Sequence, residues 1–486
     1  MTTPSCNLYF CACFEKMSFF KIVLFFLYCN LVWAANTYKA AIVDVSITDT
    51  SSGKYASLIR EAGETDVDLL VLPTPRNVVS ETEFDCINGL DNYDEIIMSV
   101  SSAARDARVY VLVQLLERYS CQNREELIRS NVVFDRDGAV ISVYRKPVNS
   151  RSKCNTTISK MGHFTTDFGV TFGVLVEDDI ILTNVKDING IKNFIVPTSS
   201  ETAFVFAKQF STFWAYTNNI NIITDNGKFS GNINMMKIPN NLIVAEFESY
   251  GASDISKTLT VIPPTTYFIG DMSQYIIKPL NLEASSQGHT ETVCQDKLCC
   301  QFYVKTSLIG YKQQDVTYGL IVLDGVQNLG NANIGLQTCS VVACAGLYKR
   351  SCFVGSEKNN TNIVFDNVLI KGNFSNGNTA HFPTILTTAQ SVMNKENFRF
   401  TPLNMNSKYV TAELYNTGNV LSFGIVSRDY SKDYETSEFG SVNNTSVIND
   451  LSDYILNEEV QEFFDYLWIR LRVLIFVVSI YVLEMM

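Results

Sequence analysis

The residues best suited to chemistry are a lysine and a carboxylate at the ends of two predicted strands. Lys146 ends a predicted hairpin, and Glu177 opens the acidic run 177–179 after a predicted strand over 170–176. An ammonium group can stabilise a developing oxyanion, and a carboxylate can transfer a proton or act as a nucleophile. Because a lysine removed from water needs an opposite charge, one interpretation is that Lys146 and Glu177 form an ion pair. The alternative is a solvated lysine beside a solvated acidic turn.

Several common catalytic patterns are absent from the sequence. The three histidines, His163, His289 and His381, are far apart in the chain, and no H-E-x-x-H zinc motif occurs. There is also no G-x-S-x-G nucleophile elbow, no P-loop and no G-x-G-x-x-G at a strand–helix junction. The sequence therefore predicts neither a bound metal nor a cofactor, and the basic residues Arg145, Arg151 and Lys153 are interpreted as a solvated loop.

Length and composition limit the classes of protein that need to be considered. The 486 residues suggest two domains, and the 46% of apolar residues can build a large core. The formal net charge of −12 argues against a nucleic-acid partner, because such binding needs a positive surface.

The elements that would position Lys146 and Glu177 alternate between strand and helix from residue 38 to about 265. Strands are predicted over 40–45, 67–72, 109–115, 170–176, 194–197 and 220–224. Helices are predicted over 55–62, with Gly63 as C-cap, over 93–104 and over 206–214. Asp137-Gly138 predicts the turn of a hairpin that joins 131–134 to 139–144. This alternation indicates an α/β layer architecture.

The pattern of predicted elements changes from about residue 266. Short predicted strands over 318–325, 362–365, 409–414 and 420–426 are separated by glycine and asparagine turns. The last six cysteines also lie in this part of the chain. We therefore expect a β-rich second domain that is stapled by disulfides.

The N-terminus resembles an export signal. Lys21 precedes a short apolar run over 22–28, and small residues follow at Ala34 and Ala35. This order is typical of a signal peptide, here 1–34 with cleavage near Ala34 or Ala35. Met17 gives a more typical start than Met1, and the alternative, a membrane anchor, needs a longer run.

Cysteines and glycosylation motifs agree with export, and the protein is expected to be extracellular or secreted. The mature chain keeps nine cysteines, an odd number, so one is free or pairs with another chain, for example in a homodimer. They are Cys86, Cys121, Cys154, Cys294, Cys299, Cys300, Cys339, Cys344 and Cys352. N-x-[ST] motifs predict glycans at Asn155, Asn359, Asn373, Asn443 and Asn444.

The C-terminal segment 466–486 is hydrophobic. Its apolar run, 473–483, is short for a spanning helix. It has the length of the removable tail of a lipid-anchor signal, which would attach the protein to the cell surface. A buried terminal strand or helix explains the run equally well.

The motifs together resemble the nitrilase superfamily. A strand ending in Pro73, a hairpin ending in Tyr144-Arg145-Lys146 and a strand containing Phe172-Gly173 follow in the family's order. The cysteine block 293–300 and the later Cys339, Cys344 and Cys352 are similar to the C-terminal domain of vanins (pantetheinases) and biotinidase. The resemblance implies an α-β-β-α sandwich, a nitrilase-like domain over 36–265 and a vanin-type domain over 266–465.

The resemblance also implies a Glu-Lys-Cys triad that hydrolyses carbon–nitrogen bonds, and two of its three positions are substituted. Lys146 falls on the family lysine. Thr74 follows Pro73, where the family has its glutamate, and Glu177 stands where the family has its cysteine, with an aspartate two residues further on. No cysteine occurs between Cys154 and Cys294, so a small alignment shift cannot supply the thiol.

Three functions of different classes follow. The first is an extracellular glycoprotein with the family fold that is catalytically inactive and binds a protein partner or a small amide-like ligand. The second is a working amide hydrolase of the pantetheinase or biotinidase type, for which Glu177 would have to act as nucleophile. The third is a dimerising or surface-anchored structural protein linked by the odd cysteine.

Overall fold

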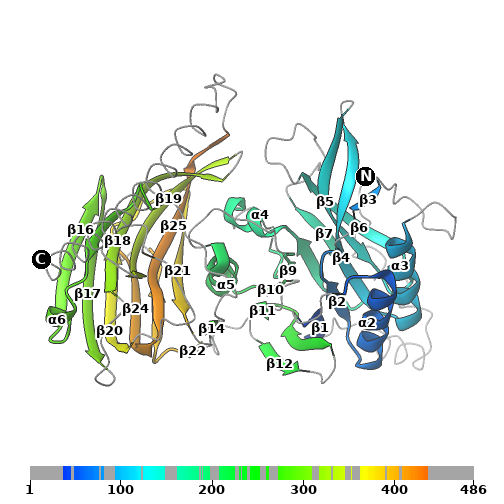
Figure 1. Cartoon of the computed structure of the whole chain (residues 1–486), viewed down its shortest axis with the longest axis horizontal. Helices are drawn as coiled ribbons and strands as arrows, with labels where there is room; N and C mark the ends of the chain where they lie inside the picture. Colours follow the sequence, from blue (N-terminus) through cyan, green and yellow to red (C-terminus); the bar gives the residue numbers. More distant parts are fainter. Residues whose placement is uncertain are drawn as a thin grey trace, which may run out of the picture. The chain divides into compact units, whose positions relative to one another are not determined.

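The computed structural model (Figure 1) describes most of the chain between Thr37 and Glu435, and the described part up to Tyr434 belongs to one compact unit. The described residues are 37–44, 49–75, 78–80, 94–121, 124–147, 161–184, 188, 190–197, 207–224, 229–230, 233–237, 241–251, 259–261, 272–308, 317–329, 332–344, 352, 362–388, 391–403 and 408–435. The predicted signal peptide 1–34 and the tail 466–486 lie outside these residues. Within them, no helix is long and apolar enough to cross a membrane.

The first sheet carries the candidate lysine. Its strand order is β12-β13-β1-β2-β4-β5-β6, and β3 pairs with β4. The strands are β1 (Thr37–Val43), β2 (Leu69–Leu72), β3 (Val78–Ser80), β4 (Tyr110–Cys121), β5 (Arg124–Phe134), β6 (Val140–Pro147), β12 (Ile233–Lys237) and β13 (Leu242–Glu248). β1, β2 and β4 run parallel to one another, whereas β4, β5 and β6 form an antiparallel meander. The predicted turn between β5 and β6 is confirmed, since Gly138 has a positive φ and donates its N–H to the carbonyl of Asp135.

Two helices cover one face of this sheet. α2 (Ser52–Glu64) begins where the Ser51 side chain accepts from the N–H of Lys54, and α3 (Glu95–Ala107) begins where Asp94 caps Ile96. The prediction that Gly63 is the C-cap of α2 is wrong, because the helix continues to Glu64 and Thr65 is the cap. A Cβ at Gly63 would come within 2.9 Å of Ala107, so the glycine permits the close approach of α2 and α3.

A second sheet packs on the other face of the first. Its order is β11-β10-β9-β8-β7. The strands are β7 (Gly162–Thr165), β8 (Thr171–Val174), β9 (Asn193–Ile195), β10 (Asn221–Ile223) and β11 (Phe229–Ser230). Tyr38, Leu112 and Tyr144 of the first sheet share a core with Phe172 and Ile195 of the second. The outer face of the second sheet packs against α4 (Glu177–Leu182) and α5 (Ala207–Asn218). The helix–sheet–sheet–helix order confirms the expected α-β-β-α sandwich.

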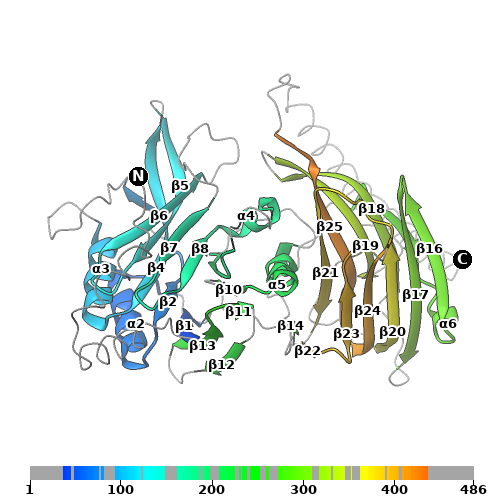
Figure 2. The ribbon, with the colours of Figure 1, turned by 180° about the vertical axis from the view of Figure 1, so that it is seen from behind.

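The rest of the described chain is β-rich, as the sequence predicted. One sheet has the order β15-β18-β19-β25-β21 and a second has the order β16-β17-β20-β24-β23. Their strands are β15 (Ile276–Pro279), β16 (His289–Gln295), β17 (Leu298–Leu308), β18 (Thr317–Leu329), β19 (Ala332–Cys344), β20 (Ile363–Gly372), β21 (Thr379–Thr387), β23 (Phe398–Thr401), β24 (Val410–Gly418) and β25 (Val420–Glu435). The short α6 (Leu282–Ser285) precedes β16, and β14 (Leu259–Val261) pairs with β22 (Ser391–Met393). Figure 2 shows these strands from behind.

Three disulfides staple this second domain. Cys300–Cys339 joins β17 of one sheet to β19 of the other, and Cys294–Cys299 joins β16 to β17 within one hairpin. Cys344–Cys352 is the third disulfide. The predicted disulfide framework is thus confirmed for these six cysteines. Cys86, Cys154 and the side chain of Cys121 lie outside the described residues.

Candidate functional site

The candidate site lies on the inner face of the first sheet, which faces the second sheet. Gln114 of β4, Asn131 of β5 and Tyr144 of β6 are direct neighbours across the strands. Lys146 lies two residues beyond Tyr144, and therefore on the same face. Tyr144 belongs to the core between the two sheets, so this row of polar side chains borders that core.

Lys146 forms an ion pair with Asp179 of α4. The second oxygen of that carboxylate accepts a hydrogen bond from the Tyr144 hydroxyl at 3.0 Å and from the N–H of Val176 at 2.8 Å. The side chains of Lys146 and Asp179 are 25% and 10% exposed, so water screens this pair only in part. Burial, followed by the neighbouring charge of Asp179, raises the pKa of the Tyr144 hydroxyl, which therefore stays protonated and donates.

The sequence of α4 explains why Asp179 takes this place. Asp179 is the third residue of the helix, and its carboxylate accepts from the N–H of Val176, the residue that precedes the helix. Acidic side chains in the first turn satisfy free N–H groups and favour helix initiation. The interpretation of 177–179 as a solvated acidic turn is therefore wrong for Asp179, which is buried and helical.

Glu177 is the first residue of α4, and its side chain lies outside the description. The ion pair between Lys146 and Glu177 therefore stays a prediction, while the carboxylate that the structure pairs with Lys146 is Asp179. The capping position of Asp179, three residues after Val176, was the sequence signal that could have identified it.

Thr74 joins a chain of hydrogen bonds. Its hydroxyl donates to the Gln114 side-chain carbonyl at 3.1 Å, and the Gln114 amide donates to Asn131 at 3.0 Å. The Asn131 amide in turn donates to the carbonyl of Leu175 at 3.4 Å, two residues before Glu177. Gln114 and Asn131 are buried, so these hydrogen bonds compensate the desolvation cost of placing their amide groups between the sheets. A hydroxyl at position 74 can donate a hydrogen bond but cannot transfer protons as a carboxylate does.

Gln114 and Asn131 were not among the predicted site residues. The sequence feature that could have identified them is an amide residue on the strand face whose other positions, such as Leu112 and Val133, are apolar. Buried polar groups of this kind need partners, and they therefore mark positions where polar contacts converge.

Arg145 corrects another expectation. It points to the opposite face of the first sheet from Lys146, where its Nε and Nη2 bind the two Glu117 oxygens at 2.9 and 3.1 Å. Ser130, between them on β5, also donates to Glu117. Arg145 is therefore part of a largely buried ion pair and not of a solvated loop. Arg151 and Lys153 lie outside the described residues.

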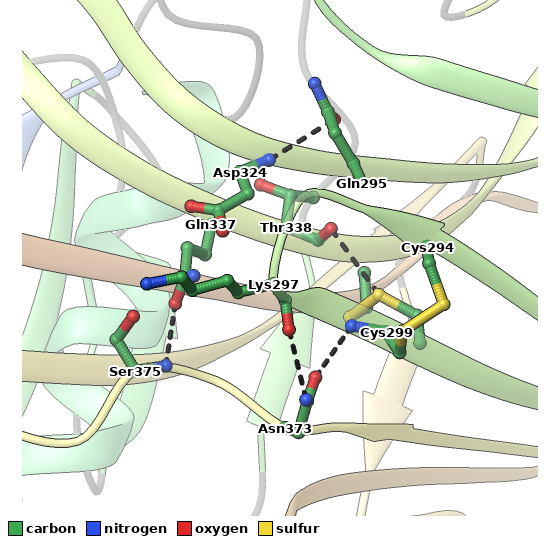
Figure 3. Close-up of a disulfide and its surroundings, with 11 residues drawn as sticks. Cys294, Gln295, Lys297, Cys299, Asp324, Gln337, Thr338, Asn373 and Ser375 are labelled. Atoms are coloured by element: carbon green, nitrogen blue, oxygen red, sulfur yellow. Dashed lines mark hydrogen bonds between the residues drawn. A yellow bond between two sulfur atoms is a disulfide. The ribbon is translucent and has the colours of Figure 1, made fainter.

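Asn373 is the one predicted glycosylation residue that the structure describes. Its side-chain oxygen accepts from the N–H of Cys299 at 2.6 Å, and its amide nitrogen donates to the carbonyl of Lys297 at 3.1 Å (Figure 3). The residue is exposed and lies directly after β20. Asn155, Asn359, Asn443 and Asn444 lie outside the description. Among the described residues, no cluster of three histidine, cysteine, aspartate or glutamate side chains could hold a metal ion.

Comparison with known proteins shows which proteins the chain is similar to. Residues 268–433 match the vanin C-terminal domain. Vanin-like protein 1 of Drosophila melanogaster is 25% identical over 375 residues, which cover 64% of this chain and 67% of that protein. Vanin-like protein 3 of the same organism is 28% identical over 65% of this chain and 72% of its own length. Pantetheinase of Canis lupus familiaris is 24% identical over 60% of this chain and 63% of its own length.

Solved structures also match in part. Nit3 of Saccharomyces cerevisiae, a member of branch 10 of the nitrilase superfamily, is 16% identical with a TM-score of 0.30, covering 44% of this chain and 90% of that one. The fold assignment rests on the strand order and the core layers, and this match adds nothing to it. The chain therefore carries a vanin C-terminal domain over residues 268–433, is similar to vanin-like proteins and pantetheinases, and has an α-β-β-α sandwich before that domain.

Proposed function

We propose that this protein is an exported, glycosylated vanin-like protein that has lost amide hydrolysis and acts by binding. The observation that carries the proposal is the residue at the family's nucleophile position, which is Glu177 and not a cysteine, and the ion pair between Lys146 and Asp179 supports it. Oxyanion stabilisation depends on positive charge that is aimed at the reacting oxygen and is not already neutralised. Asp179 neutralises the ammonium group that the family chemistry would use.

The other two family positions support the same proposal. The Thr74 hydroxyl donates to Gln114 and cannot serve as a general base at neutral pH. Position 177 is a glutamate, and the chain has no cysteine between Cys154 and Cys294. An acyl-enzyme on sulfur therefore has no atom on which to form.

The charge of the site favours a class of ligand. Because Lys146 and Asp179 cancel each other, the pair attracts neither anions nor cations strongly. A neutral amide-like molecule suits this arrangement better than an anionic one. Alternatively, within the same proposal, the protein binds a protein partner through a surface other than the candidate site.

Export is supported by sequence and covalent structure. Disulfides such as Cys300–Cys339 persist in oxidising compartments, and the N-terminal segment resembles a signal peptide. The glycans, the lipid anchor on the 466–486 tail and the intermolecular disulfide are part of this proposal. Intact-mass analysis of the secreted protein, before and after glycosidase treatment and reduction, tests all three.

A turnover assay tests the loss of hydrolysis. Purified secreted protein is incubated with pantetheine, and released thiol is compared with a no-protein blank and with a working pantetheinase. We expect release at the blank rate, together with a ligand-dependent rise in melting temperature if pantetheine is bound. Turnover that disappears in Glu177→Ala, but persists in a surface control such as Lys305→Ala, would contradict the proposal.

A further inference from the structure

The short helix α4 is held at its two ends by different parts of the chain. At its start, Asp179 contacts Lys146, Tyr144 and the backbone of Val176. At its end, the carbonyl of Ile181 accepts a 2.8 Å hydrogen bond from Nε of Arg428, which lies on β25 of the C-terminal domain.

Two further bonds fix the same end of α4. The Tyr430 hydroxyl donates to the carbonyl of Thr183 at 3.2 Å, and the Asn184 amide donates to the Asn378 side chain at 2.9 Å. Tyr430 also donates its N–H to the carbonyl of Asn378. The last residues of α4 and the residues just after it are therefore bound to one small region of the C-terminal domain, formed by Arg428 and Tyr430 of β25 and by Asn378 just before β21.

Arg428 itself is rigidly placed. Its side chain is 0% exposed, Nη1 donates to the carbonyl of Gly335 at 2.6 Å, and Nη2 binds Asp433 at 2.6 Å. The guanidinium also lies over the Tyr430 ring, 4.6 Å from its centroid. With its other nitrogens bound inside the C-terminal domain, Arg428 presents Nε to α4 in a fixed direction.

The length of α4 makes these contacts decisive. A helix of six residues has little stability of its own, because nucleation is costly and few intrahelical bonds repay it. Its position is set by the packing of Ile180 and Ile181 in the core and by the bonds at its ends. A shift at Ile181 or Thr183 is therefore transmitted to Asp179, which lies two and four residues away, within about one turn.

We propose that Arg428 and Tyr430 are positioning residues through which the C-terminal domain keeps Asp179 on Lys146. Without them, α4 loosens and the ammonium group of Lys146 becomes free to react or to bind. This inference goes beyond the proposed function, because it concerns the masking of Lys146 whether the protein binds a ligand or hydrolyses one.

The reactivity of the Lys146 amine measures this masking directly. The full secreted chain is treated with a limiting amount of an amine-acetylating reagent, and acetylation of Lys146 and of the exposed Lys305 is followed by mass spectrometry. Asp179→Asn should raise the Lys146 rate about 10-fold relative to Lys305, because it removes the carboxylate that holds the ammonium group in its charged, unreactive form. Arg428→Lys and Tyr430→Phe should raise it about 3- to 10-fold, Tyr430→Phe by less.

A matched variant separates positioning from general loosening. Arg136 is also an ion-paired arginine stacked on rings, since it binds Asp68 at 2.6 Å and lies over Tyr110 and Phe168, but none of these residues belongs to α4. Arg136→Lys should leave the Lys146 rate unchanged. Unchanged Lys146 labelling in both Arg428→Lys and Tyr430→Phe, with Asp179→Asn raised, would overturn the proposal, as would an equal rise in Arg136→Lys.

Protein folding is checked in every sample by its melting curve. If Arg428→Lys does not fold, Tyr430→Phe carries the test, since it removes one hydroxyl and keeps the ring beneath Arg428. The assay needs no turnover, so its failure leaves the proposed loss of hydrolysis untouched, and a hydrolytic activity would leave this result intact.

Discussion

In the α-β-β-α domain the polar groups near the candidate site are charged and paired, whereas in the C-terminal domain the two sheets are joined covalently. Arg145–Glu117 and Lys146–Asp179 lie on opposite faces of β6 in the first domain. Cys300–Cys339 crosses between the sheets of the second, where His381 is buried without charge compensation. The first domain should therefore respond to removal of a charge, and the second to reductant and to acid.

The largest expected effect comes from the disulfide between the sheets. Replacing Cys300 and Cys339 together by alanine should lower the free energy of unfolding by about 4 kcal/mol, because the bond constrains a loop with a sequence separation of 39. The same replacement at Cys294 and Cys299, separated by 5, should cost about 2 kcal/mol. Urea unfolding measures both. Equal losses would mean that the link between sheets adds nothing beyond a hairpin link.

The next effect tests the paired charges of the first domain. Arg145→Ala should cost about 3 kcal/mol, because it leaves the Glu117 carboxylate buried without its partner. The Glu117 side chain is 1% exposed. Lys146→Ala should cost less than half of that, since Asp179 keeps Tyr144 and Val176 as donors. If urea unfolding gave the reverse order, the view that Arg145–Glu117 is the structural pair would fail.

A pH titration tests the buried neutral group of the second domain. Burial lowers the pKa of His381 to about 4, from an ordinary value of 6.5. Between these two values the unfolded chain binds a proton that the folded chain does not, so stability falls as the pH is lowered from 6.5 to 4. The loss should approach about 3 kcal/mol in unfolding experiments. His381→Gln should lack this part of the pH dependence; a variant with the same slope as the wild type would refute the assignment.

Much of the fold was predictable because local patterns determine it. Apolar patterns identified the central strands of the first domain and, in the second, parts of β18, β20, β24 and β25, and Asp137-Gly138 identified the turn between β5 and β6. Gly63 was misread because its role depends on Ala107, a contact between two helices that no local pattern reveals.

The site was less predictable, because it depends on strand register and on contacts between distant segments. Lys146 was singled out as a candidate residue, but its partner Asp179 lies 33 residues away and was seen only in an acidic run and as the aspartate two residues after the family's nucleophile position. Which of two neighbouring residues, Arg145 or Lys146, faces the space between the sheets depends on how β6 pairs with β5.

The position of Asn373 has a consequence for how the second domain resists external thiols. Its amide nitrogen already gives one hydrogen to Lys297, so a sugar attached there would replace the other. The oligosaccharide would then stand next to the sulfur bridge of the neighbouring hairpin, whose Cys294 is exposed. The oligosaccharide would shield the disulfide sterically from external thiols, which must reach a sulfur atom in order to exchange with it.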